Sequence, residues 1–223
     1  MSDEIKNWYS KVKGTGLKRD KNYSKHMIEP NSMIVCIGGS GSGKSTSVIE
    51  FISRCDGFYE ILLFSGSGNS QTEPLYKLLL ERCPGVQCFD DINEFPDLET
   101  FEKDLPKLAI FDDFMQLSPK QMKKLNQYVT AGRKSSFSCI FMAQSYTHCP
   151  KIISRNAHYF WLFKLNDNRS IDTIARNHNQ HDIKKDDFIK LHQMVTSEPR
   201  QFLNIDLKNR LIKRNFTDIL QKC

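Results

Sequence analysis

A glycine-rich segment at residues 38–46 carries the residue types that bind phosphate. It reads Gly38, Gly39, Ser40, Gly41, Ser42, Gly43, Lys44, Ser45 and Thr46, and it contains the pattern G-x-x-x-x-G-K-[ST]. Glycines let the backbone curl so that its N–H groups point inward at a β-phosphate beside a helix N-terminus. Lys44 would then reach the β- and γ-phosphate oxygens, and the Ser45 hydroxyl would bind Mg²⁺. The segment therefore predicts a nucleotide site.

Two acidic residues and an amide follow other apolar runs and could complete that site. Asp112 and Asp113 end the apolar run at residues 108–111, and Gln144 ends the run at 139–143. Parallel α/β sheets bind ligands at the carboxyl edge of their strands. We therefore expect Asp112 to hold Mg²⁺ with Ser45, Asp113 to polarise an attacking water, and Gln144 to contact that water or the γ-phosphate. An alternative for the two aspartates is a turn in which Asp caps a helix.

The segments around these residues predict the elements that position them. Residues 33–37 are apolar and indicate a buried strand, and residues 45–55 carry apolar side chains at helical spacing. Further strands are expected at 60–64, 108–111, 139–143 and 158–164, an edge strand at 86–89, and a final strand or hairpin at 201–207 and 211–216. Helices are expected at 72–82, 98–105, 150–156, 167–178, 185–195 and from Ser118-Pro119 to about Gly132. This alternation predicts an α/β fold with a mainly parallel sheet.

Composition and charge favour one domain with a basic extension. The 223 residues include 32 Lys and Arg against 26 Asp and Glu, a net charge of +6 that mildly favours nucleic-acid partners. Lysines and aromatic residues crowd residues 1–30, which we interpret as an N-terminal arm that binds phosphate backbones, contacts a neighbouring subunit or stays disordered. Residues 31–223 are expected to form a single domain.

Cysteine usage indicates a reducing compartment. There are seven cysteines, an odd number, and Cys36 and Cys139 lie inside apolar strand-like runs. The chain shows no secretion signal and no run of 18 apolar residues, so we expect no membrane span.

In combination these motifs resemble the genome-packaging ATPases of poxviruses, other large DNA viruses and virophages, within the FtsK/HerA superfamily. The resemblance covers roughly residues 30–165. It is carried by the glycine-rich segment, Asp112-Asp113, Gly132-Arg133-Lys134, and 141–146 leading to Pro150 and Arg155-Asn156.

The resemblance implies a RecA-like three-layer P-loop NTPase fold. Numbered along the chain, the strands at 33–37, 60–64, 108–111, 139–143 and 158–164 would lie in the order 5-1-4-3-2. It also implies a ring of identical subunits, a pentamer or a hexamer, that hydrolyses ATP with Mg²⁺ and moves double-stranded DNA. Capsid or portal-like vertex proteins would be partners, at a viral assembly site in the host cytoplasm or in the virion. A neighbouring subunit would supply an arginine to the γ-phosphate; Arg133 and Arg155 are the candidates, with Arg133 favoured.

Other P-loop proteins remain as alternatives. A GTPase would need an Asn-Lys-x-Asp motif, which the sequence lacks. A helicase or plasmid-mobilising ATPase is the main alternative, followed by a small-molecule kinase. A scaffold that only binds nucleotide would leave Asp113 and Gln144 without a role.

Overall fold

The computed structural model describes residues 18–66, 68, 73–112, 117–165, 167–178 and 183–222 of the chain. Its strands are β1 Met33–Ile37, β2 Glu60–Ser65, β3 Val86–Phe89, β4 Lys107–Asp112, β5 Phe137–Ala143, β6 Tyr159–Leu162, β7 Leu203–Asp206, β8 Leu211–Arg214 and β9 Asp218–Lys222. Its α-helices are α1 Tyr23–His26, α2 Lys44–Arg54, α3 Pro74–Arg82, α4 Pro119–Ala131, α5 Lys151–Asn156, α6 Asn168–His178 and α7 Lys185–Val195. Short 3-10 helices are η2 Ile92–Glu94, η3 Leu98–Thr100, η4 Gly132–Ser135 and η5 Tyr146–His148.

Within the described residues, the nine strands join one sheet in the order β3-β2-β4-β5-β1-β6-β7-β8-β9. The strands from β3 to β6 pair in parallel, whereas β7, β8 and β9 are antiparallel. The predicted order of the five central strands is confirmed. The sheet has more strands than these five, because β3 adds to one edge and β7, β8 and β9 add to the other. The hairpin expected near the C-terminus is present, and β9, which no sequence pattern indicated, pairs beyond it.

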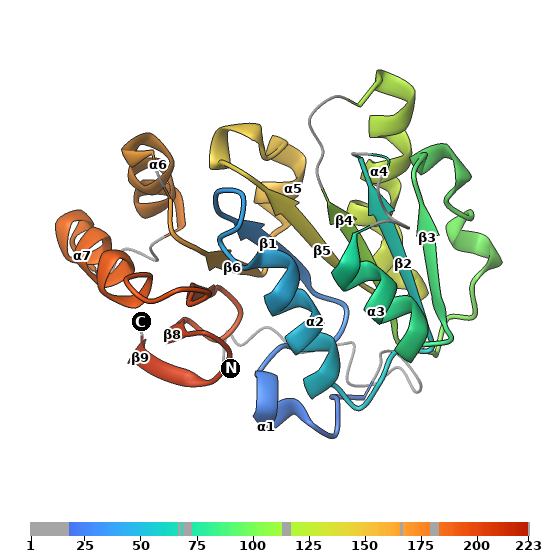
Figure 1. The fold of residues 1–223 in the computed structure, drawn as a ribbon, viewed down its shortest axis with the longest axis horizontal. Helices are drawn as coiled ribbons and strands as arrows, with labels where there is room; N and C mark the ends of the chain where they lie inside the picture. The colour runs from blue at the N-terminus through green and yellow to red at the C-terminus, as the bar shows by residue number, and fades with distance from the viewer. Residues whose placement is uncertain are drawn as a thin grey trace, which may run out of the picture.

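Alternating apolar residues bury both faces of the sheet. In β1, Met33, Val35 and Ile37 join one core, while Ile34 and Cys36 join the other. Helices α4, α5, α6 and α7 supply residues to the first core, and α2 and α3 supply the second. The result is the expected three-layer arrangement, in which α2 and α3 lie over the sheet in Figure 1.

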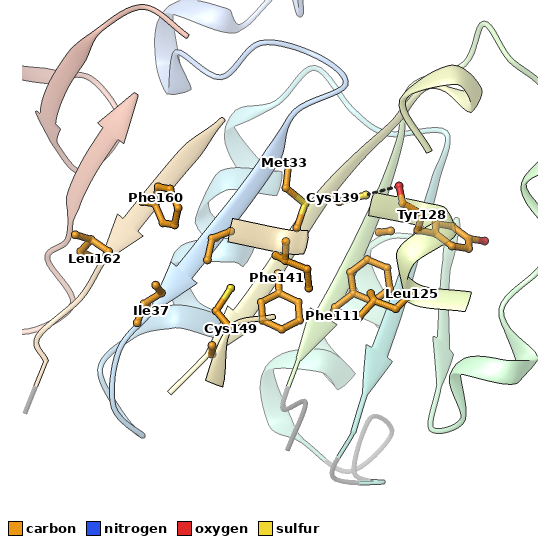
Figure 2. Close-up of a cluster of buried hydrophobic side chains, with 14 of the residues drawn as sticks. Met33, Ile37, Phe111, Leu125, Tyr128, Cys139, Phe141, Cys149, Phe160 and Leu162 are labelled. Atoms are coloured by element: carbon orange, nitrogen blue, oxygen red, sulfur yellow. Dashed lines mark hydrogen bonds between the residues drawn. The ribbon is translucent and has the colours of Figure 1, made fainter. Parts of the chain in front are cut away.

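Aromatic side chains fill the first core between the central strands and α4. Figure 2 shows Phe111 of β4 and Phe141 of β5 close to Leu125 of α4, and the thiol of Cys139 directed at the backbone oxygen of Tyr128. The Cys139 sulfur lies 3.8 Å from that oxygen, and burial raises the pKa of this thiol to about 12. Cys139 therefore behaves as the small core residue that its apolar surroundings predicted.

Two local predictions had different outcomes. Helix α4 begins with a capping box, in which the Ser118 side chain accepts from the Gln121 N–H and the Gln121 side chain accepts from the Ser118 N–H, so the start predicted at Ser118-Pro119 is confirmed. The helix predicted over 98–105 is wrong, since only the 3-10 turn η3 forms there. The Lys107 ammonium donates to the backbone oxygens of Glu102 and Leu105. These hydrogen bonds stabilise a non-helical conformation of the segment.

The described part of the predicted arm, residues 18–30, packs against the domain. His26 and Ile28 are buried, the Glu29 N–H donates to the Tyr159 hydroxyl, and the Arg54 guanidinium donates to the Lys25 backbone oxygen. Residues 1–17 lie outside the described part of the chain, so their role as an arm stays a prediction. Among the described helices, none is long and apolar enough to cross a membrane.

Candidate nucleotide-binding site

The glycine-rich segment forms a phosphate-binding loop between β1 and α2. Gly43 is the residue before α2 and has φ +103°, and Gly41 has φ +71°. Both conformations lie in the left-handed region that glycine adopts without steric cost. The loop is anchored at its start because the Gly38 N–H donates to the Ala143 oxygen at 3.1 Å. The strand, loop and helix predicted around this motif are therefore present.

Lys44 folds back across its own loop. Its ammonium nitrogen lies 2.7 Å from the Gly38 backbone oxygen and 2.9 Å from the Gly39 oxygen. Gly38 and Gly39 thus position the lysine, while residues 40–46 line an open cavity of about 570 Å³. A cavity of this size accommodates a nucleotide, and its loop side presents one cation and the N-terminus of α2.

Residues from several other segments complete the cavity. Ser65 and Asp112 come from the carboxyl ends of β2 and β4, and Gln144 comes from the end of β5. Ser65 and Asp112 are direct neighbours in the β2–β4 register. The structure therefore brings Asp112 and Gln144 to the phosphate-binding loop, as expected for the carboxyl edge of a parallel sheet. Asp113 lies outside the described residues, and its role stays a prediction.

The predicted magnesium ligands meet at one tyrosine. The Tyr76 hydroxyl on α3 donates to the Asp112 carboxylate, and it also shares a hydrogen bond with the Ser45 hydroxyl. One hydroxyl can reach both residues only if their oxygens lie close together. Two oxygen donors in this arrangement suit a hard cation such as Mg²⁺, so Ser45 and Asp112 fit the metal that their positions predicted.

Tyr76 stays protonated at this position. Its side chain is buried, and burial followed by the nearby Asp112 carboxylate raises the pKa of Tyr76. Because the phenol keeps its proton, it is a hydrogen-bond donor to Asp112 across the pH range in which the protein works. Sequence analysis did not single out Tyr76, because a tyrosine among leucines on a helix resembles an ordinary core residue.

Arg200 is a second residue of the cavity that sequence analysis missed. It lies in the loop between α7 and β7, has φ +64°, and lines the cavity beside Pro199. A Cβ placed on Gly43 would lie 3.0 Å from the Arg200 Cα, so the two backbones touch. The loop is held by Asn215, whose side-chain oxygen accepts from the Phe202 N–H at 3.1 Å. Arg200 therefore adds a cation beside the N-terminus of α2.

The two predicted arginine fingers lie at the opposite edge of the sheet. Arg133 belongs to η4, which leads into the amino end of β5, and Arg155 belongs to α5, which precedes β6. The phosphate-binding loop follows the carboxyl end of β1, which is parallel to both strands. A five-residue strand spans about 16 Å. The structure therefore does not bring either arginine to the phosphate-binding loop of its own chain.

Positive charge gathers around Arg133 at that edge. Arg133 and His158 line a hollow of about 100 Å³. Burial, followed by the charges of Lys208 and Arg133, lowers the pKa of His158 to about 4. Arg133 and Arg155 are both exposed. This edge can therefore present cations to an anion on another molecule.

The fold and the site define a P-loop ATPase. The sequence model of the poxvirus A32 protein family matches residues 86–209, which is more than half of the chain and includes Asp112 and Gln144. The chain belongs to this family, and the membership confirms the expected resemblance to the poxvirus proteins. No match was found among curated proteins.

Solved structures of other ATPases share the fold. The genome packaging NTPase B204 from Sulfolobus turreted icosahedral virus 2, in complex with AMPPCP, has a TM-score of 0.56 and 14% identity over 84% of this chain and 98% of its own. EssC (ATPases 2 and 3) from Geobacillus thermodenitrificans has a TM-score of 0.54 and 15% identity, covering 79% and 38%. The pCW3 conjugation coupling protein TcpA, with ATPγS, has a TM-score of 0.54 and 12% identity, covering 86% and 62%. At these identities the likeness establishes the fold.

Proposed function

We propose that this chain is an ATP-hydrolysing motor that packages double-stranded viral DNA into a preformed capsid. One observation carries the proposal: Lys44, Asp112 and Gln144, from three separate segments, meet at one cavity in a chain of the poxvirus A32 family. The B204 proteins that share its fold are described as a genome packaging NTPase and a DNA-packaging ATPase. The fold alone supports many functions, so the family membership is what favours packaging over other motor activities.

We assign separate tasks in hydrolysis to the predicted site residues at this cavity. Lys44 binds the β- and γ-phosphates, the N–H groups of the loop bind the β-phosphate, and Gln144 orients the attacking water. Ser45 and Asp112 would hold Mg²⁺, which supplies neutralisation of the charge that develops on the phosphates. Asp113 is proposed to polarise the water. Arg200 is placed to add a contact from the same chain to the α- or β-phosphate, since it adjoins the N-terminus of α2.

A ring of identical subunits would complete the site. Arg133 is exposed and lies far from the phosphate-binding loop of its own chain, so it can act on a nucleotide only across an interface. The positive charges of Arg133 and Lys208 near the neutral His158 support this arrangement, because an anionic nucleotide in a neighbouring subunit would meet complementary charge. Arg155, exposed on α5, is the second candidate.

The proposed packaging activity implies particular partners and a particular location. Double-stranded DNA would pass through the ring, and capsid or portal-like vertex proteins would receive it. The net charge of +6 supports contact with phosphate backbones. For localisation we propose the host cytoplasm at a viral assembly site, or the virion. The fully buried Cys36 and the buried Cys139, which pack as core residues, suit such a reducing compartment.

The test is ATP hydrolysis measured against protein concentration, with and without duplex DNA, at one fixed moderate salt concentration. We expect the rate per subunit to rise steeply with protein concentration and again with duplex DNA. The reason is that the complete site needs a neighbouring subunit, and the motor needs duplex DNA to move. The Lys44→Ala variant should show no turnover while keeping its fold, and Lys190→Ala, which changes an exposed surface lysine, should behave as wild type.

Two outcomes would contradict the proposal. Turnover that is independent of concentration and indifferent to DNA would indicate a self-contained site and a small-molecule kinase, which could be tested with small acceptors. Stimulation by single-stranded DNA alone would favour a helicase. A plasmid-mobilising ATPase is the second candidate, favoured by the likeness to TcpA, and it is distinguished by the absence of any binding to capsid proteins of the source virus.

A further inference from the structure

The first turn of α3 places Tyr76 between the phosphate-binding loop and the end of β4. Helix α3 begins at Pro74, and Tyr76 is 2% exposed, with its ring in the core that α2 and α3 share. The hydroxyl reaches out of this core into the nucleotide cavity, which Tyr76 helps to line. A buried ring with one polar atom at a polar site has little freedom, so its hydroxyl is held in a defined place.

The backbone on both sides of this hydroxyl is fixed by secondary structure. Asp112 is the last residue of β4, where it pairs with Ser65 of β2, and its backbone oxygen accepts from the Gly66 N–H at 2.9 Å. Ser45 lies in the first turn of α2. The rotation of the Asp112 carboxylate is therefore the main freedom left to this pair of residues. The hydrogen bond from Tyr76 to Asp112 restricts that rotation.

We propose that Tyr76 is a positioning residue that aligns Asp112 and Ser45 for the magnesium ion of the nucleotide. The inference rests on the proposed function, because it takes these two residues as the metal ligands. Tyr76 donates to the Oδ2 atom of Asp112 and so restricts the orientation of the whole carboxylate. Carboxylates that bind metals are commonly held by such a hydrogen bond, and removing the partner typically weakens metal affinity 10- to 100-fold.

The contact also ties helix α3 to the bound nucleotide. Helix α3 follows β2 and packs against α2, whose first turn carries Lys44 and Ser45. A change in how Asp112 and Ser45 hold a cation would act on Tyr76 and so on the first turn of α3. Tyr76 is thus a positioning residue and not a catalytic one, and its effect should appear in metal binding rather than in the fold.

The test uses the full-length Tyr76→Phe variant, which keeps the buried ring and removes only the hydroxyl. Binding of a fluorescent ATP analogue is titrated with Mg²⁺, and bound Mn²⁺ is measured by electron paramagnetic resonance. We expect nucleotide affinity in EDTA to stay within about twofold of wild type, while the Mg²⁺ concentration for half-maximal enhancement rises about tenfold. Tyr59→Phe is the matched control, because Tyr59 is 58% exposed and loses the same hydroxyl.

The outcomes separate this inference from the proposed function. If Asp112→Asn abolishes the response to Mg²⁺ but Tyr76→Phe matches wild type, Tyr76 has no positioning role and the inference is overturned. An equal loss of affinity with and without metal would overturn it too, since the tyrosine would then shape the pocket in general. If wild-type binding does not respond to Mg²⁺ at all, the metal site of the proposed function fails together with the inference.

Discussion

The hydroxyl of Tyr146 lies 2.8 Å from Nε2 of His178, which joins the segment after Gln144 to the last residue of α6. The Tyr146 N–H also donates to the hydroxyl oxygen of Ser170 on α6, at 3.2 Å. The His178 ring packs on Phe160 with 4.2 Å between the ring centroids. The strand end that carries Gln144 is therefore attached to the helices that follow β6.

This contact predicts a loss of stability in acid. Burial lowers the pKa of His178 to about 4 from its ordinary value of 6.5, so between those values the unfolded chain binds more protons than the folded one. Stability is then complete above pH 6.5 and falls as the pH drops toward 4. His178→Phe keeps a ring on Phe160 but cannot titrate. Thermal unfolding at pH 7 and pH 4.5 should show a smaller acid-induced drop for this variant than for wild type, and parallel drops would contradict the assignment.

Gly43→Ala should damage nucleotide binding more than an ordinary glycine substitution does. The residue has φ +103°, and the new Cβ would lie 3.0 Å from the Arg200 Cα. Gly57→Ala is the control, since Gly57 has φ +133° but no atom within 4 Å of the added Cβ. We expect both variants to lose about 1–3 kcal/mol of stability from backbone strain. Only Gly43→Ala should also lose at least about tenfold in affinity for a fluorescent nucleotide; equal affinities would count against a tight Gly43–Arg200 contact.

Mixed subunits test the role of Arg133. Arg133→Ala removes the candidate finger, and Lys44→Ala disables the phosphate-binding loop in a different subunit. In a mixed ring, an intact loop can face an intact arginine, so hydrolysis should recover at intermediate ratios although each variant alone is inactive. The measurement is steady-state phosphate release across mixing ratios. No recovery at any ratio would argue against Arg133, and the experiment would be repeated with Arg155→Ala.

The ion pair between Lys213 and Asp206 should be a strong determinant of stability. Their side chains are 0% exposed, and the ammonium nitrogen lies 3.0 Å from the carboxylate oxygen. Lys213→Met leaves a buried carboxylate without its cation and should cost about 3–5 kcal/mol. Lys185→Met, which breaks a half-exposed pair with Asp172, should cost less than about 1 kcal/mol. Urea unfolding measures both, and similar costs would show that burial does not decide the strength of the pair.

Sequence patterns were sufficient where structure depends on neighbours along the chain. The phosphate-binding loop could be predicted because its glycines, Lys44 and Ser45 act within nine consecutive residues, and the start of α4 could be predicted because Ser118 and Gln121 cap it locally. The buried strands were visible as apolar runs. Their central order came from the family resemblance, since periodicity says which residues are buried but not which strands pair.

The tertiary structure decided which distant side chains meet. Tyr76 and Asp112 are 36 residues apart, and Arg200 reaches Gly43 from a loop after α7, so neither contact leaves a local pattern. The same applies to Arg133 and Arg155, which the strand directions place at the edge away from their own nucleotide site. The sequence by itself determined the chemistry of the phosphate-binding loop, because backbone geometry within a short segment specifies it. The partners of that loop depend on long-range packing, which only the folded sheet establishes.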